Sequence, residues 1–280
     1  YLGTVLSLVT LVTLLYGLSM GEVDGWASPS ILGCFAIAAV GVVAFFLRES
    51  RCAEPLLDLG MLTQRNFLLG NLANFTAFML LVGSNFILPF YLEFGLGFST
   101  QKAGVFLMIG SVTSVAAGFA VGQIADKVSA RLICTVSMAV VAASFALFVC
   151  TVARLEVVWV VLYLFGLALG LGFFMAPNNK VVMSLAPPGK QGSASAVVRT
   201  LSNLGNMMGV CIFEMVFSYG LPANVLAAAP GQPAQTALMM PGWRHVYMLG
   251  TAFALVCLAL AAAAREGEYR PSSGEPVGMP

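Results

Sequence analysis

Eight long apolar segments recur along this chain, and they constrain its fold more than any other feature. We place them at residues 2–20, 30–47, 67–92, 102–123, 132–152, 157–176, 194–218 and 244–264. A bilayer core of about 30 Å needs roughly 20 mostly apolar residues in a helix, because lipid offers no partner for open backbone groups. The sequence therefore predicts an all-α membrane protein with eight transmembrane helices in the lipid bilayer.

The composition excludes the soluble classes of protein. Of the 280 residues, 59% are hydrophobic and only 9% are charged, whereas soluble domains carry about 25% charged residues. An ordinary globular enzyme and a disordered protein are excluded, because so few charges cannot cover a water-facing surface. The net charge of +1 also leaves no basic surplus for binding nucleic acid.

Sequence motifs for catalysis and metal binding are absent. The chain contains no phosphate-binding GxxxxGK[ST] loop, no HExxH pair and no GxSxG turn. Its six cysteines form no CxxC pair, and the single histidine, His245, cannot build a metal site alone. We therefore expect no enzymatic activity, no catalytic residues, no metal and no cofactor.

The loops between the segments differ in their number of cations, and this difference predicts the orientation. Lys and Arg are in excess in short cytoplasmic loops of membrane proteins. With the start of the first segment inside, ten of the 13 cations are cytoplasmic, and only Lys102, Arg154 and Arg244 lie outside. We expect a cell-membrane protein with both ends of this chain in the cytoplasm.

Loop lengths divide the segments into two plus six. Residues 1–50 are predicted to form a transmembrane hairpin, 51–66 a cytoplasmic connecting segment, 67–264 a six-helix unit and 265–280 a disordered cytoplasmic tail. Because the first residue is Tyr1, we expect the chain to be a fragment whose beginning is missing.

Three parts of the sequence carry a more specific pattern. They are Pro55–Leu59 with Arg65–Phe67, the short loop Gly122–Arg131, and the stretch from Pro177 through Gly192 and Gly205 to Gly209. All three resemble motifs of the major facilitator superfamily. The first is similar to the PLLDL…RNxF lead-in to that family's seventh core helix, and the second to its GxLaDrxGxR loop. The third is similar to the stretch that leads into its eleventh core helix. The closest resemblance is to its drug:proton antiporters with fourteen spanning helices.

The resemblance implies both a fold and a function. It makes the hairpin the extra linker pair and the six-helix unit the C-terminal half of a major facilitator fold, whose partner is the missing N-terminal half of the same chain. It implies a secondary active transporter that exports small amphipathic solutes of multidrug type against proton entry, by alternating access. Two alternatives stay open: a metabolite uniporter or symporter of the same superfamily, and a non-transporting membrane scaffold or sensor.

Two apolar segments carry a polar stripe on one helical face, at 100° per residue. In 194–218 the stripe is Arg199, Asn203, Asn206 and Glu214, with Gly205 and Gly209 on an adjacent face; in 67–92 it is Asn71, Asn74, Phe78, Asn85 and Pro89. Polar groups are costly in hydrocarbon, so we expect the stripes to line a solute cavity and the glycines to pack on a neighbouring helix. Hydrogen bonding between helices is the competing explanation.

Two further features complete the candidate residues. Glu214 is the only acidic residue well within a predicted span, and it is our candidate for carrying a proton or pairing with a cationic solute. In the loop resembling GxLaDrxGxR, a carboxylate lies close to cations at helix ends, so we expect an inner gate there; the alternative is a solvated turn. The gate residues are Gly122, Asp126, Lys127 and Arg131.

Overall fold

A computed structural model describes most of the chain. The described residues are 6, 8–10, 12–14, 16–17, 20–21, 25, 28–49, 61, 63–125, 127–187, 189–219, 221 and 233–264. The expectations for the connecting segment 51–66, for the tail 265–280 and for Asp126 therefore fall largely or wholly outside the described residues.

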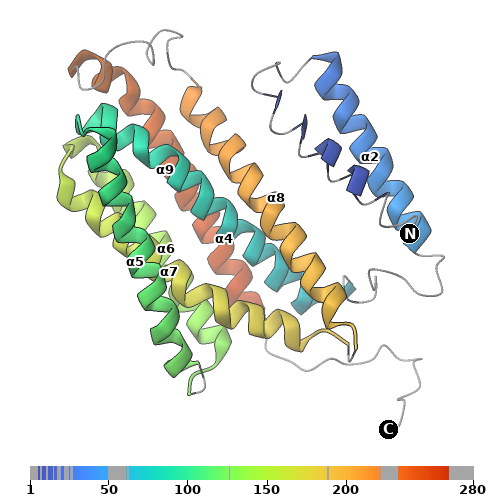
Figure 1. The fold of residues 1–280 in the computed structure, drawn as a ribbon. Helices are drawn as coiled ribbons and strands as arrows, with labels where there is room; N and C mark the ends of the chain where they lie inside the picture. Colours follow the sequence, from blue (N-terminus) through green and yellow to red (C-terminus); the bar gives the residue numbers. More distant parts are fainter. Residues whose placement is uncertain are drawn as a thin grey trace.

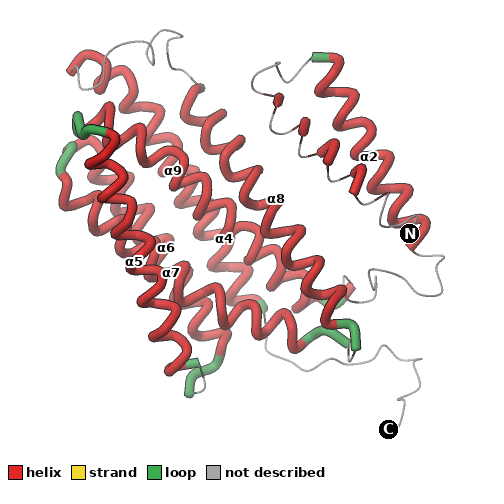
Figure 2. Tube along the Cα trace, in the orientation of Figure 1, coloured by secondary structure: helices red, strands yellow, loops and turns green. Residues whose placement is uncertain are grey.

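Helices account for almost all of the described chain, and short loops separate the helices from α4 to α8 (Figure 2). They are α2 (Pro29–Glu49), α4 (Arg65–Phe90), α5 (Thr100–Ile124), α6 (Ala130–Thr151), α7 (Val157–Ser184), α8 (Gln191–Ser218) and α9 (Pro233–Ala263). A π-helical turn, η1 (Tyr91–Gly95), extends α4, and a 3-10 turn, η2 (Val152–Arg154), extends α6. Figure 1 shows α4 to α9 as one bundle, with α2 separated from it.

Six helices, α4 to α9, are long and apolar enough to cross a membrane, which confirms the six predicted spans from residue 67 onward. The second predicted span, 30–47, corresponds to α2, whose apolar part is Pro29–Ala44. The first, 2–20, is described only at residues 6, 8–10, 12–14, 16–17 and 20. The membrane segments are helical because a helix satisfies its own backbone groups where no water is present.

Two helices extend further than predicted, and both contain a proline. The span predicted at 157–176 continues through Pro177 to Ser184, and the span predicted at 244–264 begins at Pro233 and includes Pro241. A proline removes one helical hydrogen bond, but contacts with neighbouring helices compensate in membrane bundles. Such contacts are present, since Asn178 Nδ2 donates to the Gly70 carbonyl at 3.2 Å and Thr236 Oγ1 donates to the Phe94 carbonyl at 2.8 Å.

The helices pack in a pattern that repeats after three helices. α4 packs against α8 and α9, α7 packs against α5 and α6, and the pairs α4–α7 and α6–α9 are also in contact. Exchanging α4, α5 and α6 with α7, α8 and α9 leaves these pairs unchanged, apart from a closer approach of α9 to α8 than of α6 to α5. The bundle therefore consists of two related three-helix units, an arrangement known from internal repeats in membrane proteins.

Aromatic side chains fill the bundle core where α4 ends and α7 begins. Tyr163 stacks on Phe148 with ring centroids 4.6 Å apart, and Tyr247 meets Phe148 edge to face at the same distance. Tyr91, the first residue of η1, packs its ring on Trp243 and donates its hydroxyl to the Val152 carbonyl at 2.8 Å. The core thus joins α4, α6, α7 and α9 at this level.

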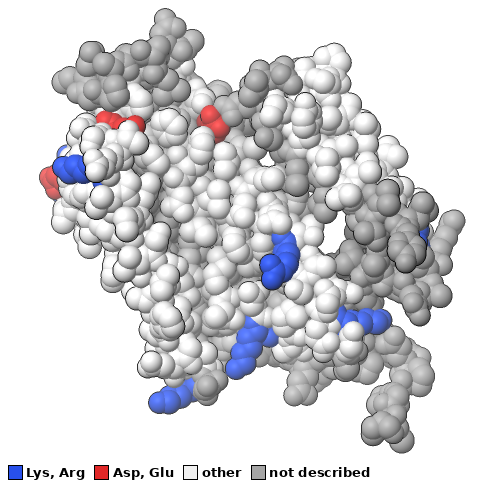
Figure 3. All heavy atoms as spheres, viewed as in Figure 1, with Lys and Arg blue, Asp and Glu red and all other residues white. Residues whose placement is uncertain are grey.

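The two ends of the bundle differ in charge. The end where α4, α6 and α8 begin carries described cations at Arg65, Lys127, Arg131, Lys180, Lys190 and Arg199, and no described acidic residue of the bundle lies there. We call it the basic end. The opposite end carries Glu93, Glu156 and Glu214 together with Lys102, Arg154 and Arg244. In Figure 3 most of the cations lie toward the lower edge of this face and the acidic residues toward its upper edge.

Glycines bring the backbones of α4 and α8 into direct contact. A Cβ atom added to Gly209 would lie 2.5 Å from the Met79 carbonyl oxygen, and one added to Gly83 would lie 2.8 Å from the Gly209 carbonyl oxygen. A Cβ at Gly205 would likewise meet the Phe75 carbonyl. The predicted packing of the α8 glycine face is confirmed, and its neighbour is α4.

This contact predicts that Gly209→Ala destabilises the protein. Backbone atoms cannot give way to the added methyl group, so we expect a loss of about 1–3 kcal/mol in the free energy of unfolding. The control is Gly118→Ala on α5, where an added Cβ meets nothing within 4 Å. Thermal unfolding of the purified protein in detergent compares the two variants, and equal effects would contradict the role of the α4–α8 contact.

Candidate functional site

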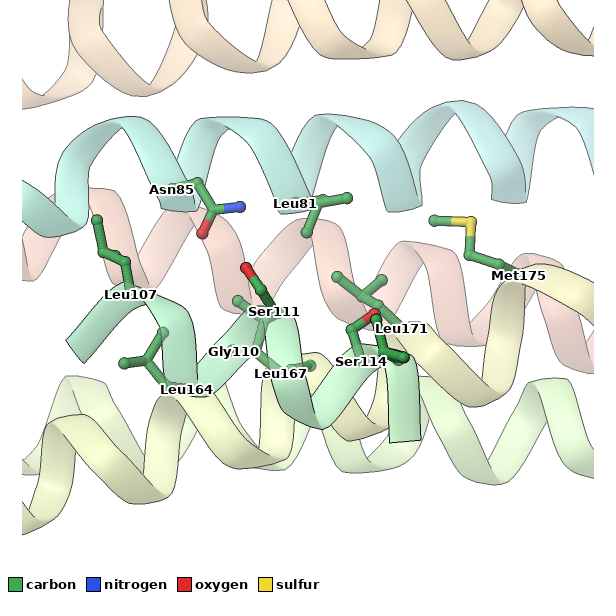
Figure 4. Close-up of a pocket in the computed structure, with 12 residues that line it drawn as sticks. Leu81, Asn85, Leu107, Gly110, Ser111, Ser114, Leu164, Leu167, Leu171 and Met175 are labelled. Carbon is green, nitrogen blue, oxygen red and sulfur yellow. The ribbon is translucent and has the colours of Figure 1, made fainter. Parts of the chain in front are cut away.

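A cavity of about 330 Å³ opens between α4, α5 and α7. We call it the α4–α5–α7 cavity; Figure 4 shows it. α4 contributes Leu81 and Asn85, α5 contributes Leu107, Gly110, Ser111, Ser114 and Val115, and α7 contributes Leu164, Leu167, Ala168, Leu171 and Met175. The cavity is open to the surface of the bundle, because Asn85, Ser111 and Val115 are exposed.

Three polar side chains interrupt an otherwise aliphatic and thioether wall. Asn85 points from α4 toward Ser111 on α5, and Ser114 lies one helical turn from Ser111 (Figure 4). None of the three side chains forms a hydrogen bond with another described residue. Each keeps its donor and acceptor capacity for a molecule that enters the cavity.

The stripe predicted on α8 lies outside this cavity and is only partly exposed. Arg199 and Asn203 are exposed, whereas Asn206 and Glu214 are half-buried. The Asn206 Oδ1 atom is buried without a hydrogen-bond partner. Arg199 and Asn203 therefore lie on an exposed side of α8, whereas Asn206 and Glu214 are partly covered.

The stripe predicted on α4 divides into a buried part and an exposed part. Asn71 and Asn74 are each only 1% exposed, and neither lines the α4–α5–α7 cavity. Asn71 Nδ2 donates to the Phe67 carbonyl at 2.8 Å, and Asn74 Nδ2 donates to Ser202 Oγ on α8 at 2.7 Å. At Asn74 the polar side chain is therefore explained by a hydrogen bond between helices, the alternative to a solute cavity.

The angular position on α4 is similar for these residues, but the neighbouring helices change along its length. Near the basic end α7 and α8 both cover α4, as the bonds from Asn178 to the Gly70 carbonyl and from Asn74 to Ser202 show. At the level of Asn85 the cavity separates α4 from α5 instead. Phe78 lies between these levels, half-buried, where a Cβ on Gly205 would be 3.3 Å from its Cβ.

The predicted gate loop connects α5 and α6 at the basic end. Gly122 and Lys127 are exposed, and Asp126 lies outside the described residues. Arg131 Nε donates to the Ala262 carbonyl at 2.9 Å, and Nη2 donates to the same oxygen. The guanidinium thus occupies the C-terminal end of α9, where helix carbonyls favour a cation.

The two serines Ser111 and Ser114 are functional candidates that the sequence alone did not single out. Serine is common at helix contacts in membranes, so its presence in an apolar segment gives no signal of a cavity. Only the meeting of α5 with Asn85 of α4 distinguishes them from packing residues.

Cysteine labelling tests which of the predicted polar residues are exposed and which are buried. In a background whose native cysteines are replaced by serine, we expect a water-soluble maleimide to label Asn85→Cys and Asn203→Cys, because both positions are exposed and polar positions of membrane helices face water or a partner rather than lipid. Asn74→Cys is the matched control and should stay unlabelled, since this position is buried against α8. Equal labelling at the three positions would contradict the structure.

A pair of serine variants separates a structural role from a cavity role. Ser202→Ala leaves the amide of Asn74 without its acceptor, so we expect a loss of roughly 0.6–1.7 kcal/mol in stability. Ser111→Ala removes no hydrogen bond within the described chain and should leave stability unchanged. Thermal unfolding measures both; a loss with Ser111→Ala as large as with Ser202→Ala would be inconsistent with this assignment.

Comparisons with known proteins agree with this architecture. The chain is 29% identical over 232 residues to the multidrug efflux pump LfrA of Mycolicibacterium smegmatis, a match that covers 83% of this chain and 46% of LfrA. It is 29% identical over 272 residues to the puromycin resistance protein pur8 of Streptomyces alboniger, covering 93% of this chain and 52% of that protein. It is also 29% identical over 178 residues to the riboflavin transporter RibZ of Clostridioides difficile, covering 64% and 39%. The chain thus spans about half the length of these relatives.

A solved structure shares the fold. A bacterial homologue of the human lysosomal transporter Spinster, in an inward-facing and occupied conformation, superposes with a TM-score of 0.59 at 14% sequence identity. The match covers 92% of this chain and 65% of that one. The sequence profile of the Major Facilitator Superfamily matches residues 1–210. This integral membrane chain therefore belongs to the Major Facilitator Superfamily.

Proposed function

We propose that this chain is the C-terminal part of a secondary active transporter that exports small amphipathic molecules against proton entry. The observation that carries the proposal is the α4–α5–α7 cavity, in which Asn85, Ser111 and Ser114 keep unpaired polar groups inside an apolar wall. Polar groups within membrane helices are costly unless they face a wet cavity or a partner, and they commonly mark a substrate pathway. Multidrug efflux and puromycin resistance, named for two relatives, support export.

In this proposal the chain supplies one wall of an alternating-access site. The accessible faces of α4, α5, α7 and α8 meet the other half of the transporter, and the two halves rock around the solute. The α8 stripe of Arg199, Asn203 and Asn206 extends the polar wall beyond the cavity. Glu214, half-buried toward the opposite end, is our candidate for a proton or a cationic group.

The charge difference between the ends supports a cytoplasmic basic end, because membrane proteins keep Lys and Arg inside. On this orientation the loop with Asp126 and Lys127 borders the cytoplasmic mouth. The bond from Arg131 to the Ala262 carbonyl ties this loop to α9. We propose that the loop acts as the inner gate, so that Asp126→Asn impairs transport without impairing membrane insertion.

Metabolite transport is the second candidate, because one relative is a riboflavin transporter. The two candidates differ in their driving force and direction. A drug antiporter needs a proton gradient for export, whereas a uniporter moves its solute without one. A non-transporting scaffold would need no accessible unpaired groups such as those of the α4–α5–α7 cavity.

The test uses the full-length protein in vesicles with an imposed pH gradient and an amphipathic fluorescent dye. We expect proton-dependent dye export that Asn85→Leu slows about fivefold, the effect of one lost hydrogen bond to the solute. The control, Gln101→Leu, changes an exposed amide at the start of α5, outside both the cavity and the gate loop, and this variant should export dye normally. Absence of dye movement in the full-length protein would refute transport of this class, and movement that survives a protonophore would favour the uniporter.

A further inference from the structure

We propose that the α4–α5–α7 cavity binds an uncharged, hydrogen-bonding part of the solute and excludes cationic groups. This inference rests on the proposed function and deepens it, because it names the chemistry of the group that the cavity accepts. Amides, hydroxyls and carbonyls attached to an aliphatic or cyclic body are the groups that fit.

The wall of the cavity offers nothing that stabilises a cation. Of the twelve lining residues, none is charged and none is aromatic. A cation that leaves water needs a carboxylate or an aromatic face in exchange, because its lost hydration is otherwise uncompensated. The cavity provides neither.

The acidic residues of the described bundle lie away from this wall. Glu93 is in η1, Glu156 precedes α7, and Glu214 is on α8, which contributes no lining residue. The nearest cation in sequence, Lys102 at the start of α5, has its Nζ atom 3.8 Å from the centre of the Phe98 ring and does not line the cavity. The cavity is therefore neutral because it contains no charged residue, and not because opposite charges cancel there.

The three polar side chains form a compact recognition set for a neutral group. Ser111 and Ser114 are three residues apart and share one face of α5, while Asn85 faces Ser111 from α4 (Figure 4). Two hydroxyls and one amide supply both donors and acceptors. A solute that pairs with these groups gains their hydrogen bonds, and a solute without a matching polar group does not.

The size of the cavity limits what it can hold. A volume of about 330 Å³ is at the lower end of small-molecule sites, which span roughly 300–1,000 Å³. The leucines on α4, α5 and α7 surround the polar set with aliphatic surface. The cavity thus accommodates one ring system or short chain with a single polar group, and any charged part of a larger solute lies outside it.

The experiment measures binding to the purified full-length protein in detergent, with two dyes of the same fluorophore. One carries a neutral amide and the other a trimethylammonium group in its place. We expect the amide dye to bind at least about tenfold more tightly. Ser111→Asp places a carboxylate in the wall, so the trimethylammonium dye should gain at least about tenfold in affinity while the amide dye loses affinity.

The matched control is Thr113→Asp, on the same helix but outside the cavity lining, which should not change the preference. If Ser111→Asp does not fold, Ser111→Ala and Ser114→Ala test whether the cavity binds the amide dye. Each should weaken binding of that dye about fivefold, whereas Thr113→Val should not. Thermal unfolding verifies that the compared variants are folded.

Two outcomes would overturn the inference: equal or tighter binding of the trimethylammonium dye by the unmodified protein, or amide binding that is indifferent to Ser111 and Ser114. These results are independent of transport. Selective binding of the amide dye without proton-driven export would refute the proposed function but not the binding site. Export that is unchanged by substitution of Ser111 and Ser114 would refute the binding site but not the transport function.

Discussion

The close contact of α4 with α8 is the constraint on which the rest of the bundle depends. Lipid chains are as apolar as leucine, so membrane helices are held together by tight packing and hydrogen bonds, with no hydrophobic drive between them. Gly83 and Gly209 bring the two backbones together, and the bond from Asn74 to Ser202 fixes their register. With α4 held on this side, Asn85 is directed toward α5, and the α4–α5–α7 cavity results.

The polar residues of the bundle are of two kinds, which differ in burial and in hydrogen bonding. Side chains such as Asn74, Ser202 and Asn178 are buried and donate to neighbouring helices or carbonyls. Asn85 and Ser111 are exposed at the cavity and have no partner in the described chain. The first kind stabilises the bundle, and the second kind is available to a solute, which is why the proposed function depends on the second.

The sequence predicted the helical fold well, because lipid leaves a chain few alternatives and long apolar segments are easy to recognise. It also predicted the glycine face of α8 from angular spacing. The ends of α7 and α9 were misplaced because Pro177 and Pro241 lie inside helices whose neighbours compensate for the lost bond. The spacing on α4 could not separate Asn71 and Asn74 from Asn85, since periodicity gives a direction around one helix but not the neighbour that lies there. Ser111 and Ser114 were missed for the same reason.

The repeat of three helices gives the cavity a counterpart. Exchanging the two units maps α4, α5 and α7 onto α7, α8 and α4, so an equivalent location exists between α7, α8 and α4. At that location Asn74, Ser202 and Asn178 join the helices by hydrogen bonds. Two equivalent sets of three helices therefore differ in what lies between them: hydrogen-bonded amides close one, and an open cavity separates the helices of the other.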